Sequence, residues 1–192
     1  MPYTIAPAQK GQAAHIATLI MIAMNHDCCQ HFAGPRHTLA DFHRVMTHLV
    51  ERDDSQYSYR NTLVALTPEG TLAGVCVGYD GKYLKPLRRA FVEAAREAFG
   101  RDFSQMTDET GPGEYYIDSL AVDERYRHQG IASALLRVAI AQHGNDQPVG
   151  LLVDAGNPTA ERLYTRLGFE YVNATTWGGH AMKHLRHPQT QP

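Results

Sequence analysis

EYYIDSLAVDERYRHQGIASALLR, residues 114–137, places a strand, a turn and the start of a helix in immediate succession. Tyr115–Val122 is rich in aromatic and β-branched residues, which predicts a buried strand. A charged turn follows, and a helical apolar pattern begins at Ile131, directly after Gly130. The unpaired N–H groups at a helix start carry partial positive charge, and glycine allows close approach of an anion. The stretch therefore predicts a strand–turn–helix unit able to bind a phosphate group.

Two ordered motifs make the interpretation more specific. Leu120-Ala121-Val122 precedes Arg127-x-x-Gly130-x-Ala132, and the later segment 157–169 reads N-x-x-A-x-x-L-Y-x-x-x-G-F. Together these resemble the signature motifs of the GCN5-related N-acetyltransferase (GNAT) family. The resemblance covers about residues 114–172, whereas the first 113 residues resemble the family only in the order of their predicted elements.

The resemblance implies an α/β (α+β) fold in which helices flank a mixed sheet of six to seven strands. It implies acetyl-CoA as the co-substrate, with the backbone amides of the 127–132 turn at its pyrophosphate. Tyr164 corresponds to the family tyrosine that protonates the leaving thiolate, and a phenol suits that role. The residues expected to bind the co-substrate are Leu120, Ala121, Val122, Arg127, His128, Gln129, Gly130, Ile131, Ala132 and Asn157. Asn157 is equally well placed to cap the helix that begins at Pro158.

Transfer to an amine also requires a base. Deprotonating a lysine-like amine at pH 7 costs about 4–5 kcal/mol, whereas releasing a thiolate costs about 2 kcal/mol. Asp118 is the first candidate for the base, because the two-residue period of a strand places it on one face with Tyr116 and Leu120. The alternative role for Asp118 is to pair with an arginine or a loop amide. Glu114 is a second candidate, for which a solvated strand start is the alternative.

The rest of the chain supplies the other elements of a single domain, residues 1–187, followed by a polar tail, 188–192, that we expect to be frayed. Periodicity and turn residues predict strands at 3–7, 62–66, 72–79, 149–153, 169–173 and 181–185, and helices at 15–24, 39–51, 84–99 and 158–167. The strands at 115–122 and 149–153 are expected to part and form the pantetheine groove.

Residues 80–113 form an insertion between the third and fourth strands, with a helix at 84–99 and a polar loop at 100–113. Two interpretations stay open for it: a helix that covers a sheet edge, or an element that narrows the acceptor site.

Composition excludes several other classes of protein. The formal net charge of −2 offers no electrostatic basis for binding nucleic acid or an anionic membrane. Neither a signal peptide nor a membrane span is predicted, and three cysteines do not form a disulfide framework, so a cytoplasmic protein is expected. The histidines and cysteines of 26–31 are interpreted as a helix end, and His180, His184 and His187 as surface residues, so no metal site is predicted.

The sequence therefore predicts an N-acetyltransferase that moves an acetyl group from acetyl-CoA to a primary amine. The absence of cysteine from both motifs favours direct transfer in a ternary complex. The insertion favours a small-molecule amine as acceptor, with a protein or peptide amine as the alternative. A non-catalytic acyl-CoA-binding module is the alternative from another class, and a homodimer is compatible with the resemblance.

Overall fold

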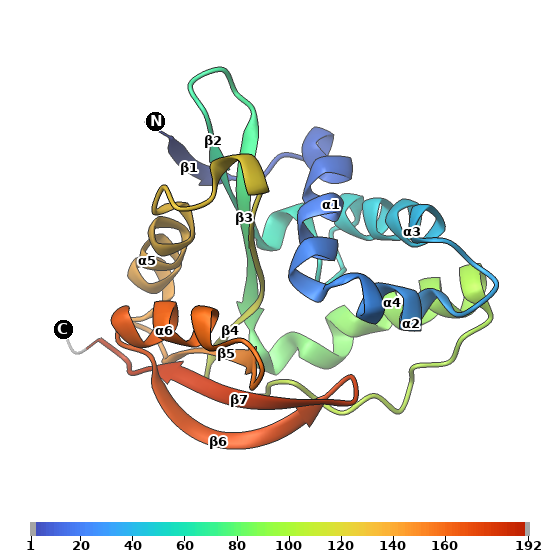
Figure 1. Ribbon diagram of the computed structural model, residues 1–192. Coiled ribbons are helices and arrows are strands. Elements are labelled where there is room, and N and C mark those ends of the chain that lie inside the picture. The colour runs from blue at the N-terminus through green and yellow to red at the C-terminus, as the bar shows by residue number, and fades with distance from the viewer. Residues whose placement is uncertain (1–2, 191–192) are drawn as a thin grey trace.

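The computed structural model describes residues 3–190 and contains seven strands and six α-helices within that range (Figure 1). In chain order the elements are β1 (Thr4–Pro7), α1 (Ala13–Met24), α2 (His26–Ala33), α3 (Leu39–Glu51), β2 (Thr62–Leu66), β3 (Leu72–Asp80), α4 (Leu84–Phe99), β4 (Tyr115–Val122), α5 (Ile131–His143), β5 (Val149–Asp154), α6 (Pro158–Arg166), β6 (Glu170–Trp177) and β7 (His180–His187). The predicted mixed sheet of six to seven strands is thus confirmed as a sheet of seven.

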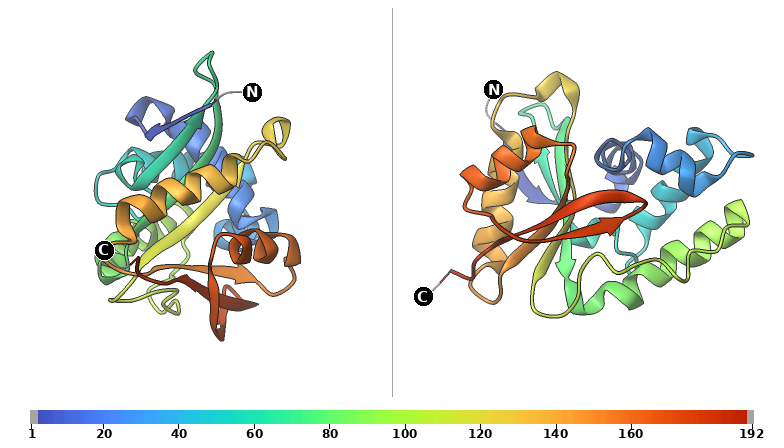
Figure 2. Two further views of the ribbon diagram at one scale, coloured as in Figure 1. Left: turned by 90° about the vertical axis from the view of Figure 1, so that its left-hand side faces the viewer. Right: turned by 60° about the horizontal axis from the view of Figure 1, so that its bottom comes forward.

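The sheet separates two hydrophobic cores. Its strand order is β1-β2-β3-β4-β5-β7-β6, with β4 and β5 parallel and the other neighbouring pairs antiparallel. Helices α1 to α4 cover one face, and α5 and α6 lie on the other (Figures 1 and 2). Phe42 and Phe91 are buried on the first side, and Leu135 and Leu136 on the second.

Strands β4 and β5 part soon after they meet, as the sequence predicts. They pair only from Tyr115 opposite Val149 to Ile117 opposite Leu151. Beyond Ile117 the β4 backbone has no β5 partner, so a groove opens between the two strands. This parting positions the candidate site.

A β-bulge in β4 corrects the predicted side-chain pattern. Val77 of β3 faces Ser119 and its neighbour Gly78 faces Ile117, so Asp118 is the extra residue. Because a bulge shifts the two-residue period, Leu120 packs in the α5 core while Ala121 packs in the α1–α4 core. The prediction that Asp118 shares a face with Leu120 is therefore wrong.

The predicted helix at 84–99 is confirmed residue for residue as α4, and its position excludes one of the two interpretations of the insertion. The sheet edges are β1 and β6, whereas α4 packs on α2 and α3 through Phe91 and Phe99. Covering a sheet edge is therefore not its role. The loop after α4 turns back toward the sheet, where Glu109 is buried.

Two local expectations also change. Residues 26–31 belong to a separate helix, α2, because Asn25 has φ of 67° and its side chain accepts a hydrogen bond from the Cys28 amide. Of the tail expected to be frayed, Gln189 Nε2 donates to Asn145 O (2.9 Å) and the Thr190 amide to Gly144 O (2.8 Å). Residues 191–192 lie outside the described residues.

We expect Gly81→Ala to destabilise the protein by about 1–3 kcal/mol, the usual cost of overpacking. Gly81 begins the insertion, and a Cβ there would lie 2.1 Å from Gly111 O. Thermal unfolding should show a melting temperature lower by several degrees. Gly111→Ala is the matched control, because its Cβ would meet no atom within 4 Å. Equal melting temperatures for the two variants would contradict this packing.

Candidate active site

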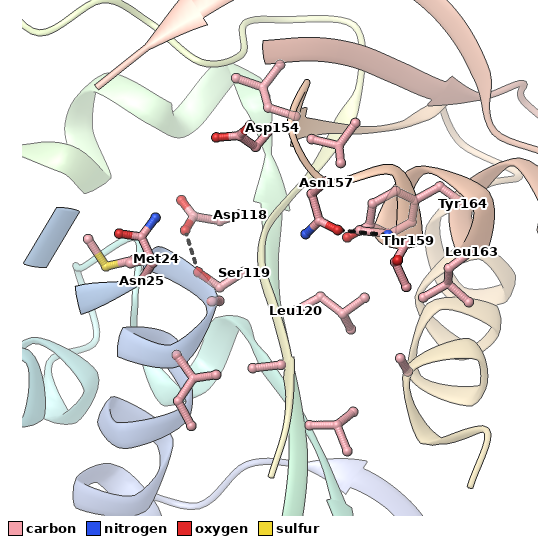
Figure 3. A pocket seen from close by; sticks show the side chains of 18 of the residues that line it. Met24, Asn25, Asp118, Ser119, Leu120, Asp154, Asn157, Thr159, Leu163 and Tyr164 are labelled. Carbon is pink, nitrogen blue, oxygen red and sulfur yellow. Dashed lines mark hydrogen bonds between the residues drawn. The ribbon is translucent and has the colours of Figure 1, made fainter. Parts of the chain in front are cut away.

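A cavity of about 790 Å³ runs through the groove between β4 and the β5–α6 segment. One wall comes from the end of α1 and the start of α2, including Met24 and Asn25, and the opposite wall from α6 (Figure 3). The α5 N-terminus and the 120–122 backbone complete it. Of the predicted site residues, Asp118, Leu120, Ala121, Val122, Arg127, His128, Gly130, Ile131, Ala132, Asn157 and Tyr164 line this cavity. Gln129 and the second candidate base, Glu114, do not line it.

The start of α5 has the form expected of an anion site. Gly130 adopts φ of 80°, a left-handed conformation that favours glycine, and no side chain caps the helix. The amides of Ile131 and Ala132 therefore remain available at the end of the helix that borders the cavity. Side chains cap α2, α3 and α6, whereas α1 and α4, like α5, begin without a side-chain cap. An uncapped helix start open to a cavity fits the pyrophosphate of a CoA thioester.

Helix α6 brings Asn157 and Tyr164 to the other side of the groove. Asn157 Oδ1 accepts a hydrogen bond from the Ala160 amide (3.1 Å), which confirms the predicted cap. Gly168 has φ of 90° just after the helix end, the left-handed conformation typical of a C′ residue. Burial raises the pKa of the Tyr164 phenol to about 12. Tyr164 therefore stays protonated at neutral pH and can donate a proton.

Asp118 lies across the groove from Tyr164, beside Met24 and Asn25 (Figure 3). Its carboxylate accepts hydrogen bonds from Tyr79 OH (2.9 Å), Gln56 Nε2 (3.0 Å) and Ser119 Oγ (3.0 Å). Burial raises the pKa of Asp118, although these hydrogen bonds act to lower it. A carboxyl group of raised pKa that lines a cavity can accept a proton.

Glu109, Trp177 and Tyr79 belong to this site and were missed from the sequence. Glu109 and Trp177 line the cavity, and Trp177 Nε1 donates to Glu109 Oε2 (3.2 Å). Tyr79 stands opposite Tyr116 in the sheet and reaches Asp118. No local signal marks Glu109, because it lies in an irregular loop. For Trp177, the available signal in the sequence was that it is the single tryptophan of the chain.

Glu114 does not share the cavity of Asp118 but borders a second, smaller one of about 300 Å³. It is buried, and it pairs with His184 Nε2 (2.9 Å) and accepts from Thr110 Oγ1 (2.7 Å). The expectations of a solvated Glu114 and a surface His184 are wrong. Strand β7 pairs with β5, where His184 stands opposite Leu152, and its imidazole reaches Glu114 just before β4. Across residues 3–190, no three His, Cys, Asp or Glu side chains form a group that could hold a metal ion.

Comparison with known proteins places the chain in a family. A model of the acetyltransferase (GNAT) family matches residues 21–169. Acetyltransferase Atu2258 of Agrobacterium fabrum is 35% identical over 69 residues, 36% of this chain, and the match covers 50% of that relative. The chain thus spans half the length of the curated relative that it matches.

Several solved structures have the same fold as this chain. A crystal structure described as an acetyltransferase has a TM-score of 0.77 at 28% identity, covering 97% of this chain and 100% of its own. An N-acetyltransferase from Staphylococcus aureus Mu50 has a TM-score of 0.79 at 21% identity, covering 95% and 99%. No helix within residues 3–190 is long and apolar enough to cross a membrane. The family model, which spans most of the chain, shows that this protein belongs to the GNAT acetyltransferase family.

Proposed function

We propose that the protein transfers an acetyl group from acetyl-CoA directly to a primary amine, and that the acceptor is a small molecule. The observation that carries the proposal is one cavity with an uncapped helix start at one end, Tyr164 on one wall and Asp118 on the other. Family membership makes acetyl-CoA the expected donor.

In this proposal the strands and α5 hold the donor. The 127–132 turn and the first amides of α5 bind the pyrophosphate, and the parted strands β4 and β5 admit the pantetheine arm between them. Leu120, Ala121 and Val122 line this passage, and Asn157 approaches it from α6. The thioester would then lie between Asp118 and Tyr164.

The positions of Asp118 and Tyr164 on opposite walls of the cavity assign the two proton transfers. An ammonium N–H bond breaks as Asp118 takes the proton, and the freed nitrogen lone pair attacks the thioester carbonyl. As the C–S bond breaks, Tyr164 donates its phenolic proton to the departing sulfur and takes up the second proton of the acylated nitrogen. The products are the amide and the CoA thiol, with one proton on Asp118 that passes to solvent. The cysteine that lines the cavity, Cys28, has its pKa raised to about 11 by burial, so it is a thiol at neutral pH. This favours direct transfer over an acetyl-cysteine intermediate.

A small-molecule acceptor is favoured by how the acceptor end is enclosed. The end beyond Asp118 is bordered by Met24 and Asn25, by Glu109 of the insertion and by Trp177 at the tip of the β6–β7 hairpin. The hairpin extends toward the loop after α4 (Figure 1), and the hydrogen bond between Trp177 and Glu109 joins the two. A peptide crossing the site would have to displace this contact.

The test is to measure CoA release from acetyl-CoA across a panel of monoamines, diamines, aminoglycosides, amino acids and short peptides. Turnover with a small amine supports the proposal, and turnover with peptides alone would move the function to protein acetylation. Tight binding of acetyl-CoA without turnover of any amine would identify the non-catalytic acyl-CoA-binding module.

Tyr164→Phe should lower kcat by about ten- to a hundredfold while leaving the Kd of acetyl-CoA within about threefold. The loss is moderate because a thiolate leaves unprotonated at a cost of only about 2 kcal/mol. Steady-state kinetics and calorimetric titration check the two quantities. An unchanged kcat would show that Tyr164 takes no part in the reaction.

We also propose a reducing, cytoplasmic setting, since Cys28, Cys29 and Cys76 are free and buried. A homodimer stays a prediction from the family resemblance.

A further inference from the structure

The acceptor end of the cavity is built around a carboxylate that the proposed chemistry does not use. Glu109 lies in the loop after α4, and its side chain is 3% exposed although it lines the cavity. Three groups hold it: Arg88 Nη2 and Trp177 Nε1 bond its Oε2, and Tyr79 OH lies 3.5 Å from its Oε1. The side chain is therefore fixed in place at the cavity wall.

Tyr79 joins Glu109 to Asp118. Its hydroxyl group donates to Asp118 Oδ2 at 2.9 Å and lies near Glu109 on its other side. The two carboxyl groups thus flank one phenol, and both line the same cavity. A ligand that enters this end meets both of them.

The charges at this end do not balance. Arg88, itself buried, is the cation that bonds Glu109, and it does not line the cavity. Asp108 also bonds Arg88 (3.1 Å) but has a second partner in Lys85 (3.5 Å). With both Asp118 and Glu109 ionised, one negative charge is left facing the cavity. An uncompensated buried charge is costly, and a cationic ligand would offset it.

Unpaired hydrogen-bonding atoms occur in the same network. Among residues 3–190, two buried side-chain atoms lack a hydrogen-bond partner, Gln56 Oε1 and Arg88 Nε. Gln56 donates to Asp118, and Arg88 donates to Glu109. Neither residue lines the cavity, so these atoms belong to the network behind the two carboxylates and are not contacts for a ligand.

We propose that Glu109 is a specificity-determining residue that, together with Asp118, selects acceptors whose reacting nitrogen enters as an ammonium ion. The inference rests on the proposed function. An ammonium ion has three N–H donors and one positive charge, which matches two carboxylates and one excess negative charge. Asp118 then removes one proton, while Glu109 keeps the nitrogen in place. Aliphatic amines, which are protonated at neutral pH, are the substrate class, and anilines, which are neutral, are disfavoured.

The test is Glu109→Gln, assayed with the best aliphatic amine that the panel returns. The KM for the amine should rise by about ten- to a hundredfold, the range expected for a lost hydrogen bond to a charged group. The KM for acetyl-CoA should stay within threefold. The N,N-dimethyl derivative of the same amine is charged but cannot be acetylated in this way, and its inhibition constant should rise in step with KM.

Asp108→Asn is the matched control, because Asp108 bonds the same arginine without lining the cavity. It should leave the amine KM within twofold, and the melting temperatures of both variants show whether the fold is retained. An unchanged amine KM in Glu109→Gln, an equal rise in Asp108→Asn, or a wild-type preference for anilines would overturn the inference. Absence of turnover with any amine would instead refute the proposed function.

Discussion

Asp118→Asn should reduce kcat/KM for the amine by about 10²- to 10⁴-fold, the usual contribution of a general base. The side chain lines the cavity opposite Tyr164, whereas the second candidate base, Glu114, lies just before β4 and borders a different cavity. Asparagine keeps the size of the side chain and removes its ability to take a proton.

The pH profile separates this role from a structural one. Burial raises the pKa of Asp118, and a base acts only when it is deprotonated, so wild-type kcat/KM should fall as the pH drops through that raised pKa. The variant should lose this acidic limb and keep its affinity for acetyl-CoA. A variant with the wild-type rate and the same acidic limb would exclude Asp118 as the base.

Gly130→Glu should weaken acetyl-CoA binding by about 10²- to 10⁴-fold. Two effects add. A non-glycine residue at φ of 80° is strained by about 1 kcal/mol, and a carboxylate near a pyrophosphate repels it by about 4 kcal/mol per charge pair at 4 Å. A steric clash does not contribute to the loss of affinity, since a Cβ at Gly130 meets only Tyr3 OH, at 3.7 Å.

Gly130→Gln separates the two effects, because glutamine has the same length without the charge. We expect it to lose about tenfold in affinity, with the remaining loss confined to the glutamate variant and reduced by added salt. Calorimetric titration with acetyl-CoA measures both. Wild-type affinity in Gly130→Glu would show that the α5 start does not bind the pyrophosphate.

Several elements were predictable because their signals are local. Helix α3 starts after Thr38, whose side chain forms a capping box with Asp41, and α4 ends at Gly100 in the left-handed conformation. Strand β4 and the start of α5 follow from the composition of residues 115–131 and from Gly130. In each case the signal lies in the residues of the element itself or directly beside it.

The groove itself was predictable for a related reason. Two motifs that each occupy one βα segment bring the Gly130 turn, Asn157 and Tyr164 to one cavity. The parallel pairing of β4 and β5 is what brings them together, and the strand–helix alternation of residues 115–166 encodes it.

The Asp118 end of the cavity depends on contacts between residues far apart in the chain. Glu109 is bonded by Trp177 across 68 residues, and Asp118 by Gln56 across 62. The bulge that exposes Asp118 to the cavity exists only in the register with β3. Neither the burial of a side chain nor the register of a strand can be predicted from the residues next to it in the sequence.

By itself, the sequence determined the order of the strands, the family, the bounds of α3 and α4 and most of the residues that line the groove, since capping, periodicity and glycine conformation are short-range properties of the chain. Only the tertiary structure decided that α4 packs on α2 and α3 and that Glu109 and Asp118 lie on either side of the Tyr79 hydroxyl group. It also decided that Trp177 bonds Glu109 and lines the same cavity. These features depend on which segments pack together after folding, and long-range packing is what sets burial, charge balance and the shape of a cavity.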